Sequence, residues 1–212
     1  MNKQDELDLV KNKILSELKC PLKDAANNLV FGQGNPNAEI LFIGEAPGEK
    51  EDMQGIPFVG KAGKQLNKLL NKIELTIDDV YIANILKYRP PKNRDPSKEE
   101  IISHTPYLIE QIKIIKPKII ATLGNYSTKF VLANFNVKEM KTIEGISELH
   151  GKPKKITING FETIVIPIYH PAAQMYNPKV KEHFENDFKI MAKILGKKFI
   201  KDEINKTLVS NL

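Results

Sequence analysis

The fold of this 212-residue chain is decided by the stretch AEILFIGEAPG at residues 38–48. Its first half is almost continuously apolar, which is typical of a strand covered on both faces in a parallel sheet. Its second half combines two glycines with a proline and a glutamate, and this favours a tight turn. The stretch predicts a buried strand whose turn brings backbone N–H groups close to a ligand. The plain alternative is a turn that only starts a solvated acidic helix.

Three further runs rich in β-branched and aliphatic residues predict strands at residues 80–85, 118–123 and 163–168. Amphipathic spacing predicts helices at residues 5–18, 61–72, 97–115, 126–133 and 180–195. The third of these helices begins with the sequence SKEE, the pattern of a capping box. Strand and helix alternate along the chain, so we expect right-handed crossovers between parallel strands.

The predicted fold class is α/β, a three-layer α/β/α sandwich with a central four-stranded parallel sheet. We expect a single domain over residues 1–212, with its core at about 15–195 and a polar, loosely attached tail at 197–212. In such a fold, ligands bind at the carboxyl ends of the strands.

Composition excludes several classes of protein. The chain is 41% hydrophobic and has no apolar run long enough to span a membrane and no N-terminal apolar signal, so we expect a folded, intracellular, cytoplasmic protein without a membrane partner. Its net charge of +6 comes mostly from lysine, as an AT-rich genome also produces, so charge alone is weak evidence for a nucleic-acid partner. The single cysteine, Cys20, forbids an internal disulfide and any metal site built from several cysteines.

Unusual residues follow the predicted strands directly. Gly44, Glu45 and Ala46 follow the first, Asn84 lies at the end of the second, and His170 follows the fourth. A buried asparagine needs partners, and its amide matches the edge of a nucleobase or another small amide. An isolated histidine is more often structural, but one at the carboxyl end of a strand and before a proline is well placed for ligand chemistry. We expect these side chains to converge on one site.

Two loops add to this candidate site. Residues 55–63, GIPFVGKAG, place Phe58 among glycines, where its ring either stacks on a ligand or folds back into the core. Residues 87–96, KYRPPKNRDP, carry four basic residues on a proline-stiffened loop, which favours contacts with phosphate groups. The candidate phosphate contacts are Lys87, Arg89, Lys92 and Arg94.

Taken together, these motifs resemble the family 4 uracil-DNA glycosylases. The resemblance rests on GEAPG at 44–48, GIPFVGKAG at 55–63, Asn84 with KYRPPKNRDP at 87–96, and HPAA at 170–173, with further matches at 30–38 and 150–152. It covers about residues 15–195. Several motifs in the right order and spacing are far more specific than a single glycine-rich loop.

The resemblance implies an enzyme that flips uracil out of DNA and hydrolyses its N-glycosidic bond, leaving an abasic site for base excision repair. Phe58 would stack on the uracil, Asn84 would pair with its edge, and backbone from Gly44 to Ala46 would contact the ring. His170 would stabilise negative charge on a uracil oxygen. Where the best-known branch has a water-positioning aspartate, this chain has Ala46, so either Glu45 or backbone would hold the water.

The resemblance also implies a loop that wedges into the base stack, at Gln174, Met175 and Tyr176. Glu51 or its neighbours would form the wall that excludes the methyl group of thymine. Lysines such as Lys61, Lys64 and Lys179 would lie near the site. The partner would be uracil-containing DNA, single- or double-stranded, bound by a monomer, and we expect no covalent adduct.

Family 4 members usually hold a [4Fe–4S] cluster through four cysteines. The matching positions here are Glu17, Cys20, Tyr88 and His104, so three thiolates are absent. We therefore expect no cluster and no cofactor, with packing around Tyr88 in its place. A lone metal ion held by Glu17, Cys20 and His104 is the weaker alternative.

Three other functions stay open. The same fold could excise another deaminated base such as hypoxanthine, or serve as a noncatalytic DNA-binding relative. A noncatalytic DNA-binding protein needs phosphate contacts but no base pocket, so Glu45, Phe58, Asn84 and His170 together argue against this alternative. A mononucleotide-binding enzyme of doubly wound type is less favoured, because the chain has neither a GxGxxG nor a GKS/GKT loop.

Overall fold

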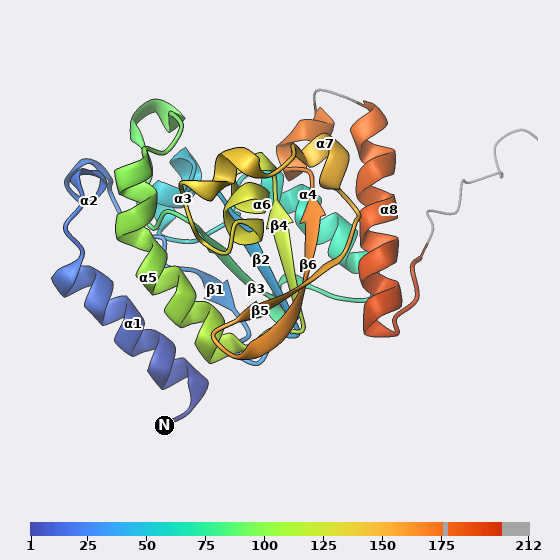
Figure 1. The fold of residues 1–212 in the computed structure, drawn as a ribbon, viewed down its shortest axis with the longest axis horizontal. Helices are drawn as coiled ribbons and strands as arrows, with labels where there is room; N and C mark the ends of the chain where they lie inside the picture. Colours follow the sequence, from blue (N-terminus) through green and yellow to red (C-terminus); the bar gives the residue numbers. More distant parts are fainter. Residues whose placement is uncertain (176–177, 201–212) are drawn as a thin grey trace, which may run out of the picture.

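The computed structural model describes residues 1–175 and 178–200, with side chains described for 1–173 and 180–200. In this part of the chain, one mixed sheet lies between two layers of helices (Figure 1). The strands are β1 (Gln33–Gly34), β2 (Ile40–Gly44), β3 (Tyr81–Asn84), β4 (Ile119–Leu123), β5 (Lys154–Ile158) and β6 (Phe161–Ile168). Their order across the sheet is β1-β3-β2-β4-β6-β5.

The four predicted strands are confirmed as β2, β3, β4 and β6, which pair in parallel. The predicted central four-stranded parallel sheet is confirmed in part: the whole sheet has six strands and is mixed, because β1 and β5 add antiparallel edges beside β3 and β6. Both edges lack the apolar run that marks the inner strands. β1 has only two residues, and β5 begins with the two exposed lysines Lys154 and Lys155. Short or lysine-rich edge strands resist pairing with other chains.

The helices are α1 (Lys3–Glu17), α2 (Pro21–Ala25), α3 (Glu49–Gln54), α4 (Lys61–Asn71), α5 (Lys98–Ile115), α6 (Asn125–Leu132), α7 (Ile146–Leu149) and α8 (Pro178–Leu195). The five predicted helices correspond to α1, α4, α5, α6 and α8. The capping box is confirmed, since Ser97 and Glu100 each accept a hydrogen bond from the other's backbone N–H. The short helices α2, α3 and α7 have too few residues for an amphipathic pattern.

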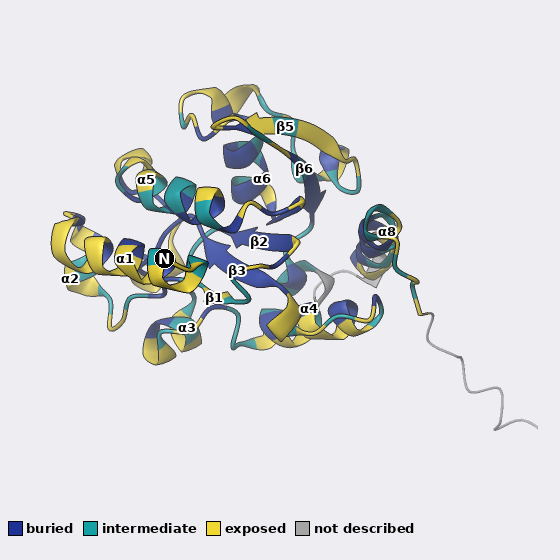
Figure 2. Cartoon of the chain, turned by 90° about the horizontal axis from the view of Figure 1, so that it is seen from below, coloured by how far each residue is buried: buried dark blue, intermediate teal, exposed yellow. Residues whose placement is uncertain are grey.

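Each face of the sheet has its own hydrophobic core. Leu41 and Ile43 of β2 pack with α1, α5 and α6, whereas Ile40 and Phe42 pack with α4 and α8. Figure 2, viewed along the sheet, shows buried strands between these two helical layers. All five residues of β2 are buried, as the apolar run predicts for a strand covered on both faces.

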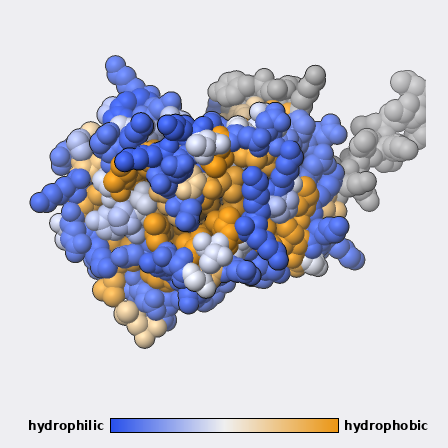
Figure 3. Space-filling view, in the orientation of Figure 1, coloured by the Kyte–Doolittle hydropathy of each residue, from blue (hydrophilic) through white to orange (hydrophobic). Residues whose placement is uncertain are grey.

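The surface is mixed in character. The face drawn in Figure 3 is largely hydrophilic, with hydrophobic side chains gathered near its middle. None of the described helices is both long and apolar enough to cross a lipid bilayer. Of the predicted tail, residues 197–200 pack beside α4, where the Ile200 N–H donates to the Lys72 carbonyl at 2.7 Å. Residues 201–212 lie outside the described part.

The stacked rings of Phe42 and Phe188 provide a test of the core between β2 and α8. Their centroids lie 6.3 Å apart, and both side chains are fully buried. Phe188→Ala should lower the free energy of unfolding by about 3–5 kcal/mol, because it removes apolar contacts and leaves a cavity. Urea denaturation measures this. The control Ile102→Ala, at a residue 56% exposed, should change stability by less than about 0.5 kcal/mol; equal effects would contradict this assignment of the core.

Candidate functional site: a pocket at the carboxyl ends of the strands

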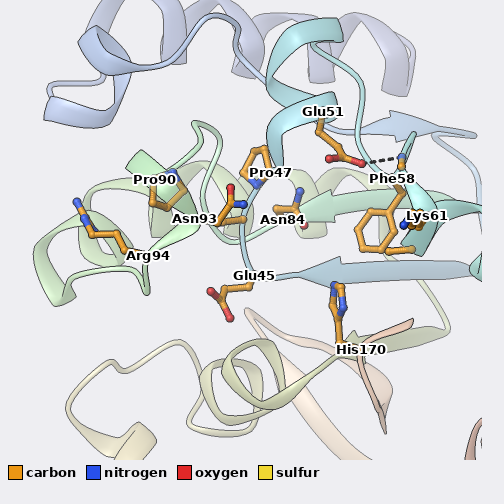
Figure 4. Close-up of a pocket in the computed structure, with 14 residues that line it drawn as sticks. Glu45, Pro47, Glu51, Phe58, Lys61, Asn84, Pro90, Asn93, Arg94 and His170 are labelled. Atoms are coloured by element: carbon orange, nitrogen blue, oxygen red, sulfur yellow. Dashed lines mark hydrogen bonds between the residues drawn. The ribbon is translucent and has the colours of Figure 1, made fainter. Parts of the chain in front are cut away.

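A pocket of about 370 Å³ opens where β2, β3 and β6 end (Figure 4). The volume lies within the usual range for small-molecule sites. Gly44, the last residue of β2, pairs in register with Asn84, the last residue of β3. His170 follows β6 and enters from the opposite side. The pocket is lined by Glu45, Ala46, Pro47, Gly48, Glu51, Phe58, Gly60, Lys61, Ala62, Asn84, Pro90, Asn93, Arg94 and His170.

The floor of the pocket depends on the absence of a side chain at Gly44. A Cβ at this position would overlap the Oδ1 atom of Asn84 and lie 3.1 Å from the Phe58 ring. Asn84 is only 2% exposed, and its Oδ1 atom has no hydrogen-bond partner among the described residues. Buried polar atoms are normally paired, so this unpaired oxygen, packed against Gly44, makes Asn84 a candidate for a ligand contact.

Phe58 lines the pocket with a partly buried ring. Its backbone has a positive φ of 55°, which is uncommon for a bulky residue and marks a conformation held by its surroundings. Gly63 of α4 makes this conformation possible, because a Cβ there would overlap the Phe58 carbonyl. The Phe58 and His170 rings lie 6.2 Å apart between centroids and are tilted by 41°. Phe58 both lines the pocket and packs against the core beside β2, α4 and α8, so it combines features of the two sequence alternatives.

The hydrogen bonding of His170 determines which ring nitrogen faces a ligand as a donor. Its Nδ1 atom accepts a hydrogen bond from the Ala172 N–H at 3.3 Å. In the neutral ring, the proton therefore resides on Nε2. Burial lowers the pKa of His170, and the nearby Glu51 carboxylate opposes part of this shift. The imidazole is thus neutral at neutral pH, with an Nε2–H group as donor.

Glu45 lies between the pocket and the loop after β3 (Figure 4). Burial, with a smaller contribution from the negative charge of Asp95, raises the pKa of Glu45 from 4.5 to about 7. A carboxyl group with this pKa exchanges its proton near neutral pH, which is the property of a general acid or base.

Glu51 joins two loops of the pocket. Its Oε1 atom accepts a hydrogen bond from the Gly60 N–H at 2.9 Å, and its Oε2 atom lies so close to Gly48 that a Cβ there would be 2.7 Å away. From the sequence, Glu51 was expected only as one candidate for the pocket wall. Pro90 and Asn93 also line the pocket and were not among the candidates. Their position depends on how the loop folds, which no local pattern predicts.

Two arginines of the basic loop after β3 make hydrogen bonds within the protein. Arg89 donates from Nε to the Oδ1 atom of Asn93 at 2.7 Å. Arg94 binds the Glu100 carboxylate of α5 but keeps 47% of its side chain exposed. Lys92 is exposed and has a positive φ of 54°. Three of the four predicted basic residues therefore reach the surface near the pocket.

Lys87 departs from the prediction. It is completely buried, so its ammonium group is not available to a DNA phosphate. Its Nζ atom donates to the Asn84 carbonyl at 2.9 Å and to the Oε1 atom of Gln111. The sequence placed Lys87 with its basic neighbours in one loop, but the chain at residues 84–87 still runs through the core.

The four positions that the resemblance assigns to cluster ligands differ in their surroundings. Cys20, Tyr88 and His104 are buried, while Glu17 is exposed at the end of α1. The Nδ1 atom of His104 lies 2.7 Å from the Glu100 carbonyl, which assigns it the ring proton. Its Nε2 atom is unpaired, and burial lowers the pKa of His104 to about 4. Within the described residues, no three His, Cys, Asp or Glu side chains gather to hold a metal ion.

The structure does not test the loop that was predicted to wedge into the base stack. Residues 171–175 form a 3-10 turn directly after His170. Tyr176 and the side chains of Gln174, Met175 and Lys179 lie outside the described residues.

The pocket at the carboxyl edge of the sheet brings together the Asn84 amide, the Phe58 ring and the His170 imidazole. Residues 31–192 match the Uracil DNA glycosylase superfamily, and the chain belongs to this family.

Curated relatives cover nearly the whole chain. The Type-4 uracil-DNA glycosylase of Saccharolobus solfataricus is 46% identical over 195 residues, which is 92% of this chain and 88% of the relative. That of Archaeoglobus fulgidus is 44% identical over 194 residues, covering 92% of this chain and 96% of the relative. The Type-4 enzyme of Thermotoga maritima is 37% identical, covering 82% and 86% of the two chains.

The carboxyl group of Glu45 should titrate near pH 7, and carbon-detected NMR of labelled glutamate measures this directly. Asp95→Asn should lower the pKa of Glu45 but leave it above 4.5, because burial is the larger cause of the shift. Since folding raises this pKa, the associated stabilisation is present at acid pH and is lost as pH rises through about 7. Glu45→Gln identifies the signal, and a midpoint near 4.5 would show that the carboxylate is fully solvated.

Proposed function

We propose that this chain is a uracil-DNA glycosylase that flips uracil from DNA into the pocket and hydrolyses its N-glycosidic bond. The observation that carries the proposal is the unpaired Asn84 amide oxygen, packed against Gly44 in a pocket that the Phe58 ring and the His170 imidazole also line. Family membership and the curated relatives support the same activity. The reaction leaves free uracil and an abasic site in the DNA, which is the entry to base excision repair.

Base recognition follows from the chemistry of the amide. Uracil presents an N–H group between two carbonyl oxygens, so it can donate to the Asn84 Oδ1 atom and accept from its amide N–H. The Phe58 ring provides an apolar surface for the face of the flipped base. Backbone from Gly44 to Ala46 completes the contacts along the ring edge. Glu51, which holds the two loops together, forms the wall beside the base and excludes a methyl substituent.

His170 stabilises the leaving group. As the N-glycosidic bond breaks, its electron pair moves into the uracil ring and negative charge grows on a ring oxygen. The Nε2–H group of a neutral His170 is a preorganised donor for that charge. Because the ring is already oriented by the Ala172 N–H, little rearrangement is needed at the moment of reaction.

Glu45 or the adjacent backbone holds the water molecule that attacks the sugar. The oxocarbenium-like sugar is a strong electrophile, so a water needs orientation more than deprotonation. A carboxyl group with a pKa of about 7 is suited to accept the proton that the water loses. Ala46, next to it, has no polar side chain for this task.

The DNA backbone contacts the surface around the pocket. Arg89, Lys92 and Arg94 on one side and Lys61 and Lys64 on the other supply positive charge for phosphates. Gln174, Met175 and Tyr176 are proposed to enter the base stack and replace the flipped nucleotide. The finer parts of the proposal are a single domain, a monomeric enzyme acting on single- or double-stranded uracil-containing DNA, no covalent adduct, and a place in the cytoplasm.

A lesion panel tests the proposal. Purified protein is incubated with oligonucleotides that contain uracil, hypoxanthine or thymine, and abasic sites are then cleaved with alkali. We expect release of uracil. His170→Ala and Asn84→Ala should each slow release by more than about tenfold, because each removes a group that binds the transition state.

Each alternative function has its own outcome in this assay. Release of hypoxanthine but not uracil would assign the same fold to another deaminated base. Salt-sensitive DNA binding without release of any base would identify a noncatalytic relative. Near-normal rates in His170→Ala or Asn84→Ala would refute the role of that residue.

We also propose that the enzyme works without an iron–sulfur cluster. A [4Fe–4S] cluster needs four thiolates, and the chain contains only Cys20. At the matching positions, Tyr88 and His104 fill buried space with their rings 6.3 Å apart, edge to face. These residues do not fit the cluster, so no step of the reaction is routed through it.

Iron independence has a direct test. Protein made in iron-depleted medium should have the same uracil-release rate and the same melting temperature as protein made with added iron. Absorbance near 400 nm and metal analysis should show no stoichiometric iron. A loss of activity or stability on iron depletion would contradict the proposal.

A further inference from the structure

Lys87 carries a buried amine without a countercharge. Its side chain is fully buried, and no carboxylate pairs with it in the described part of the chain. Burying a charged amine without a partner is costly, so such a residue is rarely retained by packing alone. The burial of this amine therefore indicates a function that an apolar residue of the same length could not perform.

Two oxygen atoms receive the hydrogen bonds of the Lys87 amine. One is the main-chain carbonyl of Asn84, at 2.9 Å, and the other is Oε1 of Gln111 in α5. Gln111 is itself held, because its Nε2 atom donates to the Phe31 carbonyl at 3.0 Å. Burial lowers the pKa of Lys87 to about 7, and the amine has enough N–H bonds for both acceptors whether it is protonated or neutral.

The contact with Asn84 lies directly behind the pocket. Asn84 is the last residue of β3, and the turn that follows is tied to β2 by two hydrogen bonds, from Ile85 N–H to the Gly44 carbonyl and from Leu86 N–H to the Glu45 carbonyl, both at 3.0 Å. Lys87 closes this turn by binding the Asn84 carbonyl. The orientation of that peptide sets the direction in which the Asn84 side chain leaves the backbone.

We infer that Lys87 is a positioning residue for base recognition: its amine, anchored to α5 through Gln111, holds the Asn84 peptide so that the carboxamide faces the pocket. This role replaces the phosphate contact expected from the sequence. It rests on the proposed function, because it acts through the amide that pairs with uracil. Misplacing such a group by about 1 Å can cost a large factor in rate even though no contact to the substrate is removed.

The test is a double-mutant cycle measured in single-turnover uracil release. Lys87→Met keeps an unbranched side chain of similar length and removes the donors. It should lower the rate constant by about tenfold or more in the otherwise natural chain, but by less than about threefold when Asn84 is already alanine. The affinity for DNA and its dependence on salt should stay unchanged, because these report phosphate contacts.

Thr163→Val is the matched control. Thr163 is also buried and donates to a main-chain carbonyl, that of Pro117 at 2.9 Å, but it lies at the opposite end of the sheet from the pocket. The Thr163→Val variant should have a lower melting temperature than the natural chain but the same rate constant of uracil release. A general loss of stability would instead affect both variants alike.

Three results would overturn the inference. The first is a Lys87→Met rate equal to that of the natural chain, and the second is an equal loss with and without Asn84. The third is a weaker salt dependence of DNA binding in Lys87→Met, which would show that Lys87 contacts DNA phosphates. If Lys87→Met does not fold, Gln111→Leu takes its place in the cycle and should show a smaller loss that disappears in the Asn84→Ala background.

Failure of the inference is distinguishable from failure of the proposed function. If the natural chain releases no uracil, or if Asn84→Ala has no effect, the proposed function or the role of Asn84 fails, and the inference fails with it. If those two results are as expected and Lys87→Met is fully active, only the positioning role is wrong.

Discussion

The close approach of β2 and β3 at their carboxyl ends is the constraint on which the site depends. Gly44 pairs with Asn84, and any side chain at Gly44 would occupy the space of the Asn84 amide and press on the Phe58 ring. The same end of the strands carries the turn tied down by Lys87. The absence of a Cβ at Gly44 therefore makes room for a buried amide and an aromatic ring beside the pocket. Glycine is needed here for close approach rather than for its φ angle.

Burial shifts the pKa values of the ionisable groups in and behind the pocket. It lowers the pKa of His170, raises that of Glu45 and lowers that of Lys87, because each charged form loses contact with water. Hydrogen bonds orient these groups, as the one from the Ala172 N–H does for His170. A neutral imidazole donor and a carboxyl group that titrates near neutral pH suit a reaction in which a base leaves as an anion and water takes its place.

Much of this arrangement could be predicted from local patterns. The four parallel strands appeared as apolar runs, α5 carried its capping box, and Glu45, Asn84 and His170 were singled out because they follow strand ends. The edge strands were missed because β1 is too short and β5 too polar to leave an apolar pattern. The role of Lys87 was misassigned because a cation in a basic loop has the same local sequence whether it faces solvent or the core.

The sequence by itself determined the family, the inner sheet, the main helices and the absence of enough thiolates for a four-cysteine cluster, since these depend on residue type and spacing. Only the tertiary structure decided which side chains share the pocket. It placed Phe58 at the wall, Glu51 between two loops and Lys87 behind Asn84. The physical reason is that burial and hydrogen-bond partners are set by residues distant in the chain, and these contacts, not the identity of a residue, determine its charge state and the direction in which it points.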